Sequence, residues 1–234
     1  MEPKQDDMLH SRLYAILEQS LNEIYVFDTQ TLRFSYVNRF AQRNLGYSAD
    51  ELAEMTPFQI NPEFDEVFFR GMADSLLKGQ NENLVFETQH LRANGTLYPV
   101  EVHLQRFAQP GREEFLAIVL DITTRRLAEA ALRDSEMRFR TMANTIPQLA
   151  WIAKTDGSRS WYNQRWCDYT GTYPEEALGW GWQKFHDPEV LPQVIRRWTE
   201  AVSAGQAFDM EFPLRRSDGN FRIFLTRAEP LRDA

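Results

Sequence analysis

The sequence predicts an α+β protein with two similar domains, each a five-stranded antiparallel sheet with small helices on one face. The first observation behind this prediction is an internal repeat, in which Tyr36-Val37-Asn38 returns 125 residues later as Trp161-Tyr162-Asn163. The second is the order of patterns in the first copy, where two strand-like segments precede helical segments and three more strand-like segments follow. The third is a turn between strands in each copy, at Asn94-Gly95 and Asp218-Gly219.

The repeat has the length of a whole domain. Gly79-Gln80 returns as Gly205-Gln206 after 126 residues, and Arg92 returns as Arg216 after 124 residues. This period is far longer than the roughly 20–50 residues of solenoid repeats. The expected organisation is an N-terminal amphipathic helix over residues 1–22, a first domain over 23–124, a helical connector over 125–147 and a second domain over 148–234.

The first copy is expected to begin with a helix and two strands. In the helix, apolar residues recur at helical spacing, at Leu9, Leu13, Ile16 and Leu17. Strands over residues 23–28 and 34–38 follow, separated by a turn. Ser48 and Glu51 then have the spacing of a capping box, which predicts a short helix over residues 49–54.

A longer helix is expected in both copies, because a proline precedes an apolar periodic segment and a glycine follows it. Pro62 and Gly79 bound this segment in the first copy, and Pro188 and Gly205 bound it in the second. The apolar positions in the first copy are Phe64, Val67, Phe68, Gly71 and Leu76. Those in the second copy are Val190, Leu191, Val194, Ile195, Trp198 and Val202.

Strands with an apolar residue at every second position follow in each copy, a pattern typical of one buried face. The alternating apolar residues are Val100, Val102 and Leu104 in the first copy and Phe208, Met210, Phe212 and Leu214 in the second. The first copy adds a final strand over residues 114–121, whereas the sequence ends at Ala234 before the matching strand of the second copy. We therefore expect the second sheet to lack its last strand.

The connector has a heptad pattern. Its apolar and small residues are spaced alternately four and three apart, at Ala128, Leu132, Ser135, Phe139, Met142 and Ile146. Two interpretations stay open: an amphipathic helix that packs on its own domain, or a parallel coiled coil between two chains. In the second case Leu132, Phe139 and Met142 form the dimer seam.

The junction between the first domain and the connector is a candidate site of signal transmission. Asp121 ends the last strand, so its carboxylate could cap the following helix or pair with Arg125. A side chain that links the sheet to the helix would make a change in the sheet alter the helix. The candidates are Asp121, Thr123 and Arg125.

Composition excludes several classes of protein. A net charge of −8, with basic residues interleaved among acidic ones, argues against a nucleic-acid surface. We find no segment apolar enough to span a membrane and no signal peptide, so we expect a cytoplasmic location. The single cysteine, Cys167, excludes a disulfide framework and is expected to be a buried structural thiol. Motifs for catalysis or metal binding are also missing from the sequence.

Each sheet and its helices enclose a core that is either filled or able to hold a ligand. The aromatic candidates for cavity walls are Phe27, Tyr36, Phe40, Phe58 and Phe86 in the first domain and Trp161, Trp166 and Trp198 in the second. All six tryptophans fall in the second domain. An aromatic-lined ligand cavity and an ordinary aromatic core both fit this composition.

Both copies resemble PAS domains, the sensory modules of bacterial signalling proteins, over nearly the whole chain. In the first copy the resemblance rests on Tyr36-Val37-Asn38, residues 46–52, Asn94-Gly95 and Asp121-Ile122-Thr123. Residues 161–166, 169–171, 185–188 and 216–219 of the second copy are similar to a PAS subclass of sensor histidine kinases. Residues 131–136 with 138–139 resemble the segment that introduces a further PAS domain in such kinases.

The resemblance implies a signal-sensing and dimerisation region of a bacterial two-component sensor histidine kinase. Such a region detects a small ligand or a partner and passes the change through the connector to an output domain, expected beyond residue 234 of the parent chain. The implied partners are a second copy in a homodimer, an unknown small molecule and that output domain. The alternatives are a ligand-free PAS interaction scaffold and the sensor of a diguanylate cyclase or another signalling output.

The resemblance also bears on cofactors. Flavin-binding relatives carry a reactive cysteine in an Asn-Cys-Arg-Phe type of motif, which residues 163–167 do not match. Haem-binding relatives take a histidine from the long helix, and the expected helix of the first copy contains none. We therefore expect neither flavin nor haem, and no other cofactor is evident. His90, His103 and His186 are interpreted as surface or capping residues.

Overall fold

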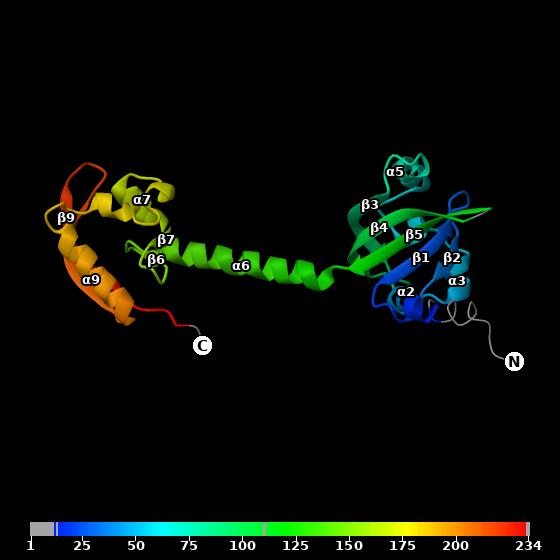
Figure 1. Cartoon of the computed structure of the whole chain (residues 1–234), viewed down its shortest axis with the longest axis horizontal. Helices are drawn as coiled ribbons and strands as arrows, with labels where there is room; N and C mark the ends of the chain where they lie inside the picture. Colours follow the sequence, from blue (N-terminus) through cyan, green and yellow to red (C-terminus); the bar gives the residue numbers. More distant parts are fainter. Residues whose placement is uncertain (1–11, 13, 110, 233–234) are drawn as a thin grey trace. The chain divides into compact units, whose positions relative to one another are not determined.

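The computed structural model describes residues 12, 14–109 and 111–232 and divides the chain into two compact units, Met1–Ala131 and Leu132–Ala234 (Figure 1). The division falls within helix α6 (Thr123–Thr145), inside the segment expected to be the connector. Residues 14–19 are helical. Leu9 and Leu13 of the expected N-terminal helix lie outside the described residues.

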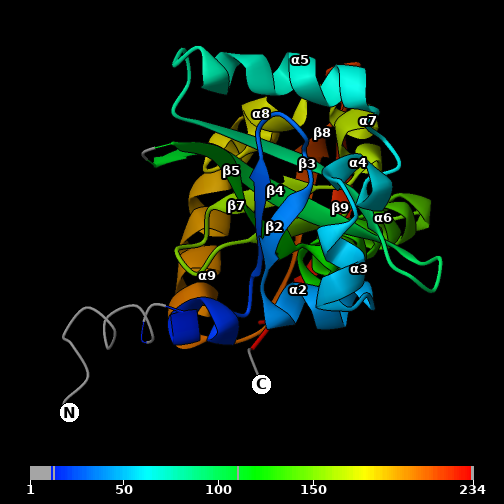
Figure 2. The same ribbon diagram turned by 90° about the vertical axis from the view of Figure 1, so that its right-hand side faces the viewer.

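The first unit contains a five-stranded antiparallel sheet in the order β2-β1-β5-β4-β3 (Figure 2). Its strands are β1 (Glu23–Asp28), β2 (Phe34–Val37), β3 (Asn83–Leu91), β4 (Leu97–Gln109) and β5 (Arg112–Asp121). β5 pairs with β1 on one side and with β4 on the other, so the last strand of this unit is central. The fold expected for the first copy is confirmed.

Short helices connect β2 to β3 in the first unit. They are α2 (Arg39–Leu45), α3 (Ala49–Ala53), α4 (Pro57–Ile60) and α5 (Glu66–Leu77). α3 packs against β2, and α5 packs against β3 and β4. The predicted capping box is present, since the Ser48 hydroxyl accepts from the Glu51 amide and the Glu51 carboxylate accepts from the Ser48 amide.

The buried face of α5 differs from the predicted face. The helix begins after Asp65, whose carboxylate accepts a hydrogen bond from the Phe68 amide at 2.8 Å, and not directly after Pro62. Val67 and Phe68 are consequently 81% and 56% exposed. The residues of α5 that face the core are Phe69, Ala73 and Leu76. Pro62 therefore lies in the segment before the helix, and the N-cap Asp65 determines where the helix begins and which of its residues face the core.

The second unit contains two separate ladders, β6-β7 and β8-β9. The strands are β6 (Trp151–Ala153), β7 (Arg159–Tyr162), β8 (Phe208–Arg215) and β9 (Phe221–Ala228). Across the described residues of this unit no strand joins the two ladders, whereas β5 joins β1 to β4 in the first unit. Among the described residues, the second unit therefore shows the incomplete sheet that the sequence predicts.

The core of the second unit is aromatic. Its helices are α7 (Gln164–Thr170), α8 (Pro174–Ala177), the 3₁₀ helix η1 (Gly181–Phe185) and α9 (Leu191–Ala204). Trp166, Trp182 and Trp198 are each at most 5% exposed. The alternation predicted for β8 is confirmed, because its apolar residues Phe208, Met210, Phe212 and Leu214 are all buried. Among the helices described here, none combines the length and apolar character that a bilayer crossing requires.

Candidate ligand-binding and signal-transmission sites

The core of the first domain leaves a cavity of only about 30 Å³, lined in part by Phe27 and Phe86. This volume suits about one water molecule. Phe58 packs against the same core, and Phe40 is half-buried. Tyr36 instead lines a separate surface hollow of about 540 Å³. The first domain therefore has a nearly filled core.

A buried carboxylate lies next to this small cavity. Glu23 is fully buried and accepts hydrogen bonds from the hydroxyls of Tyr25 (2.6 Å) and Tyr98 (2.8 Å) and from the Asn44 amide (2.5 Å). His90 Nδ1 lies 3.6 Å from Glu23 Oε2, and His90 lines the cavity. Burial alone would raise the pKa of Glu23, but the nearby His90 ring, with the hydrogen bonds from Tyr25 and Asn44, outweighs burial and lowers it. The prediction that His90 is a surface residue was wrong, because it is 5% exposed.

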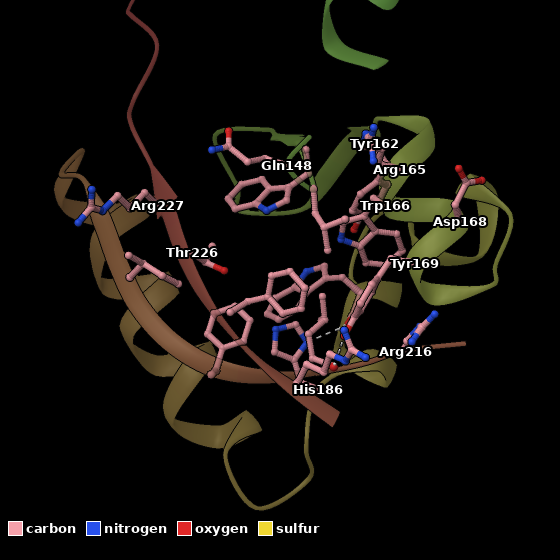
Figure 3. A pocket seen from close by; sticks show the side chains of 18 of the residues that line it. Gln148, Tyr162, Arg165, Trp166, Asp168, Tyr169, His186, Arg216, Thr226 and Arg227 are labelled. Carbon is pink, nitrogen blue, oxygen red and sulfur yellow. Dashed lines mark hydrogen bonds between the residues drawn. The ribbon is translucent and has the colours of Figure 1, made fainter. Parts of the chain in front are cut away.

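In the second domain an open space of about 880 Å³ lies between the two ladders, at the place that β5 fills in the first domain (Figure 3). Trp166 and Tyr169 of α7 line it together with apolar residues of both ladders. Its arginines are Arg159, Arg165, Arg216, Arg222 and Arg227. Among the described residues that line it, only Asp168 is acidic. An excess of cationic side chains attracts anions into a concave surface.

Arg159 is buried in an aromatic cage at this cavity. Its guanidinium carbon lies 3.2 Å from the ring centre of Trp151, 4.2 Å from that of Trp198 and 5.1 Å from that of Trp182. Arg159 is 7% exposed, and burial lowers its pKa to about 9, so it is still a cation at neutral pH. Arg159 Nη1 and Trp182 Nε1 are buried donors without a hydrogen-bond partner among the described residues.

His186 lies at the same cavity, between the rings of Trp182 and Phe212. Burial lowers its pKa to about 4, against the hydrogen bond that its Nδ1 makes at 3.1 Å to the Trp182 carbonyl. The charge of Arg159 acts in the same direction as burial. His186 is therefore neutral at pH 7. Of the two roles predicted for it, the surface role is wrong, because it is 8% exposed, whereas the capping role is confirmed, because His186 is the C-cap residue of η1 and its amide donates to the Gln183 carbonyl.

The remaining predicted residues of the second domain are placed in its core or near the connector. Trp198 donates from Nε1 to the Gly157 carbonyl at 2.8 Å, which fixes one wall of the cage. The Trp161 ring packs at a tilt against Phe139 of α6, with ring centres 5.1 Å apart. Cys167 is buried as predicted, and burial raises the pKa of its thiol, which disfavours a reactive thiolate.

One asparagine in each copy attaches the preceding helix to its domain. Asn38 Oδ1 accepts from the amides of Ile24 and Ala41, both at 3.1 Å, while its Nδ2 donates to the carbonyls of Leu17 (3.1 Å) and Asn22 (2.9 Å). These four bonds join a helix, a strand and the start of α2. They are the physical reason for an asparagine at this position.

Asn163 repeats this arrangement in the second domain. Its Oδ1 accepts from the amides of Ala150 (3.0 Å) and Trp166 (3.1 Å), and its Nδ2 donates to the carbonyls of Ala143 and Gln148, both at 2.9 Å. Ala143 belongs to α6. The motif that revealed the repeat is therefore the attachment point of the connector, a role that the sequence patterns had not indicated.

The start of α6 is bound to the sheet of the first domain by charged groups. Asp121 Oδ1 accepts from the Thr123 amide at 2.8 Å, so Asp121 caps the helix, and Asp121 also lies 3.5 Å from Arg92. Arg125 does not pair with Asp121. It contacts Glu87 of β3 at 2.5 Å and Glu101 of β4 at 3.1 Å.

The remaining cation at the start of α6 reinforces this link. Arg126 contacts Glu87 at 2.6 Å, so one carboxylate of β3 binds two consecutive arginines of the helix. His103 Nε2 lies 2.8 Å from Glu101, the other carboxylate. A movement of β3 or β4 would change these contacts directly.

The predicted dimer seam of α6 is exposed. Leu132 is 63% exposed, Phe139 is 46% exposed and Met142 is 70% exposed. No residue of α6 is buried within the part of the chain that the structure describes. The helix thus presents its heptad residues for contact with another surface.

Comparison with known proteins gives one family match in each unit. A family model described as a PAS domain matches residues 22–124, and a model described as a PAS fold matches residues 159–234. A crystal structure of the PAS domain of an HTR-like protein from Haloarcula marismortui has a TM-score of 0.45 and 32% identity, covering 50% of this chain and 99% of that one. A PAS domain from a two-component sensor histidine kinase has a TM-score of 0.43 and 20% identity, with 50% and 99% coverage.

The curated relatives are longer proteins. Uncharacterized protein y4lL of Sinorhizobium fredii is 30% identical over 217 residues, which are 92% of this chain and 26% of that protein. The peroxide stress-activated histidine kinase mak1 of Schizosaccharomyces pombe is 22% identical over 92% of this chain and 14% of its own length. The chain thus spans about a quarter or less of these relatives. With a PAS match and a PAS-like order of elements in each unit, the chain belongs to the PAS family and carries two PAS domains in tandem.

Proposed function

We propose that this chain is the sensing and dimerisation region of a two-component sensor histidine kinase in the cytoplasm. Its PAS domains detect a small ligand or a partner, and α6 passes the change toward an output domain. The observation that carries this proposal is the attachment of α6, whose first turn is bound to Glu87 and Glu101 and whose last turn is held by Asn163. The name of mak1 as a histidine kinase supports this choice of output.

Two arrangements of the sheet would give two states of the connector. Ligand or partner binding that shifts β3 or β4 moves Glu87 and Glu101, because the two carboxylates lie on those strands. Arg125 and Arg126 then lose or change their contacts, which alters the first turn of α6. A signal needs only a difference in ligand affinity between the two arrangements.

Dimerisation through α6 is part of the proposal. The partner that packs on the exposed apolar residues of α6 is a second copy of this chain, because these residues follow the four-three spacing of a two-stranded coiled coil. In a parallel pair, the two helices would couple the sensory domains of both chains.

The test is an ATP-dependent phosphorylation assay of the parent protein that contains this chain. We expect an acid-labile phosphoryl group on a histidine, and we expect Glu87→Gln to change its rate relative to the exposed control Glu136→Gln. Absence of phosphohistidine would reject the kinase output. Formation of a cyclic dinucleotide from GTP in the same preparation would support the alternative output, a diguanylate cyclase.

A second candidate function, a ligand-free scaffold, is favoured for the first domain by one observation. Its core cavity is only about 30 Å³, too small for an organic ligand without rearrangement. Native mass spectrometry and an absorbance spectrum of the purified chain test this. The proposal includes no haem or flavin, so a visible absorbance band would contradict that part of it.

A further inference from the structure

A buried carboxylate of the first domain is replaced by leucine in the second. Glu23 is fully buried at the start of β1. The repeated asparagine identifies its counterpart, because Asn38 accepts from the amide of the residue after Glu23 and Asn163 accepts from the amide of the residue after Leu149. Leu149 packs against the core of its domain. Since a buried carboxylate is costly and a leucine is not, the needs of the fold do not explain Glu23.

The partners of this carboxylate also differ between the two copies. His90 and Tyr98 lie opposite each other on β3 and β4, and both rings lie beside Glu23. The pair at the same place in β8 and β9, 124 residues later, is Leu214 and Arg222. The buried polar cluster is therefore a special feature of the first domain, the one that leads into α6.

Two routes connect Glu23 to Arg92 at the surface. In the first, Asn44 Nδ2 donates to Glu23 Oε1 at 2.5 Å, and Asn44 Oδ1 accepts from Arg92 Nη2 at 3.1 Å. In the second, the Tyr98 hydroxyl donates to the same carboxylate oxygen at 2.8 Å, and the guanidinium carbon of Arg92 lies 3.8 Å from the centre of the Tyr98 ring. A carboxylate on one side and a guanidinium on the other fix the orientation of the Asn44 amide.

Arg92 in turn contacts the carboxylate that caps α6. Arg92 Nη2 lies 3.5 Å from Asp121 Oδ2, while Asp121 Oδ1 accepts from the Thr123 amide at 2.8 Å. The charges therefore alternate in sign from Glu23 through Arg92 to Asp121. Hydrogen-bonded groups in such a series polarise and position one another. Without Glu23, the Asn44 amide would be free to turn, and Arg92 would lose the group that positions it beside Asp121.

We infer that Glu23, Asn44 and Arg92 form a relay from the core of the first domain to the N-cap of α6. At the core end, His90 Nδ1 lies 3.6 Å from Glu23 Oε2, and His90 lines the cavity of about 30 Å³. A change in the hydrogen bonding of Glu23 at this end alters how firmly Asp121 caps the helix.

This inference rests on the proposed transmission through α6 and adds a second route to it. The first route passes through Glu87 and Glu101 on the outer part of the sheet. The relay instead begins in the buried core, so a rearrangement around His90 reaches the connector without any movement of β3 or β4 at those two carboxylates.

Amide hydrogen exchange in the first turn of α6, residues 123–126, tests the relay in the whole chain. Glu23→Leu, which introduces the residue of the second copy, should accelerate this exchange at least about threefold, because it weakens the cap. The matched control is Glu114→Leu. Glu114 is also buried, but it contacts Ser35 and Arg112 near the other end of β5. It should leave this exchange unchanged. Equal acceleration by both variants, or none by Glu23→Leu, would overturn the relay.

A double variant separates the relay from a general loss of stability. Asp121→Ala removes the cap and should itself accelerate exchange in residues 123–126. Glu23→Leu should then add nothing, because Glu23 acts through Asp121. If the two effects multiply, the sites are independent, and the relay is wrong.

If Glu23→Leu fails to fold, Arg92→Met interrupts the relay at a partly exposed position. It should accelerate the same exchange at least about threefold, whereas Arg112→Met, at an exposed arginine that pairs with Glu114, should not. Unchanged exchange in Arg92→Met would contradict the relay. None of these measurements involves phosphorylation, so failure of the relay and failure of the kinase proposal are distinguishable.

Discussion

At the scale of single residues, Asn38 and Asn163 show what the repeated motif does. Each side chain makes four hydrogen bonds to backbone groups and is fully buried. Asparagine is the side chain of this length that offers both an acceptor and two donors, because an ionised aspartate has no donor and leucine has no polar atom. The attachment of the preceding helix therefore depends on one amide group in each domain.

Asn163→Ala should destabilise the second domain by about 2–4 kcal/mol, because it leaves several buried backbone groups without partners. The control Asn144→Ala removes a single exposed acceptor, which receives the Gln164 amide at 2.8 Å, and should cost less than about 1 kcal/mol. Urea unfolding followed by tryptophan fluorescence measures both, since all six tryptophans lie in the second domain. Equal destabilisation by the two variants would contradict the special role of Asn163.

His186 gives the second domain a defined pH dependence. Its pKa falls from 6.5 to about 4 on folding, so between these values the unfolded state binds more protons than the folded state. The contribution of neutral His186 to the free energy of unfolding is therefore fully present above pH 6.5, and it decreases as the pH falls toward 4. The lost contribution reaches about 3 kcal/mol for a shift of about 2.5 pH units at 1.36 kcal/mol each.

His186→Asn should remove this dependence. Asparagine is the residue at the matching position of the first copy, Asn61, which lies 125 residues earlier. The measurement is the urea unfolding free energy of the wild type and the variant at pH 8, 6 and 5, monitored by tryptophan fluorescence. The free energy of unfolding of the wild type should fall more steeply than that of the variant as the pH decreases from 8 to 5. A constant difference would show that His186 titrates normally in the folded state.

At the scale of elements, the first turn of α6 depends on Glu87 more than on any other carboxylate of the sheet, since Glu87 contacts both Arg125 and Arg126. All three side chains are partly exposed, so solvent screens each pair and each contributes little to the stability of the domain. Glu87→Gln should therefore loosen the first turns of α6 without unfolding the domain. Hydrogen exchange should accelerate a few-fold in these turns.

The matched control for this prediction is Glu136→Gln, in an exposed part of the same helix. It should leave exchange in the first turns unchanged. High salt should reduce the difference between the wild type and Glu87→Gln, because exposed ion pairs are screened. Identical exchange rates in the wild type and Glu87→Gln would show that these ion pairs do not couple α6 to the sheet, and would contradict transmission of a signal at this junction.

The elements themselves could largely be predicted from the sequence, because their signals are local. Alternation identified β4 and β8, and the Ser48 box identified the start of α3. The rotation of α5 could not be predicted from Pro62, since the N-cap at Asp65 sets it. Tertiary partners decide such details, and periodicity carries little information about them.

The binding features were harder to predict for a physical reason. His90 was predicted to be a surface or capping residue and no pattern singled out Arg159, yet both are buried through contacts with residues distant in sequence. The repeat did contain a signal for Arg159, because an alignment of the two copies puts Arg159 at the position equivalent to Phe34. Comparing the two copies position by position, with attention to charged residues at apolar positions, would have found it.

At the scale of the whole molecule, the two PAS domains differ in the space that their cores provide. The first has a cavity of about 30 Å³ beside a buried carboxylate, and the second has a cavity of about 880 Å³ with several arginines. The larger volume lies between the ladders β6-β7 and β8-β9, which no strand joins among the described residues, whereas β5 fills the corresponding place in the first domain. α6 is the element through which either domain would act on the second copy.

Met142 and Met137 test that assembly as a matched pair. Both are exposed methionines of α6, at 70% and 59%, but only Met142 occupies a position of the heptad seam. Met142→Glu should weaken the dimer at least about tenfold, since two carboxylates would face each other across a parallel seam. Met137→Glu should leave the dimer intact, because its side chain lies off the seam. Sedimentation velocity over a range of concentrations measures both dissociation constants. Dissociation by both variants alike, or by neither, would place the contact between copies away from the heptad seam and leave α6 as a helix that serves its own chain alone.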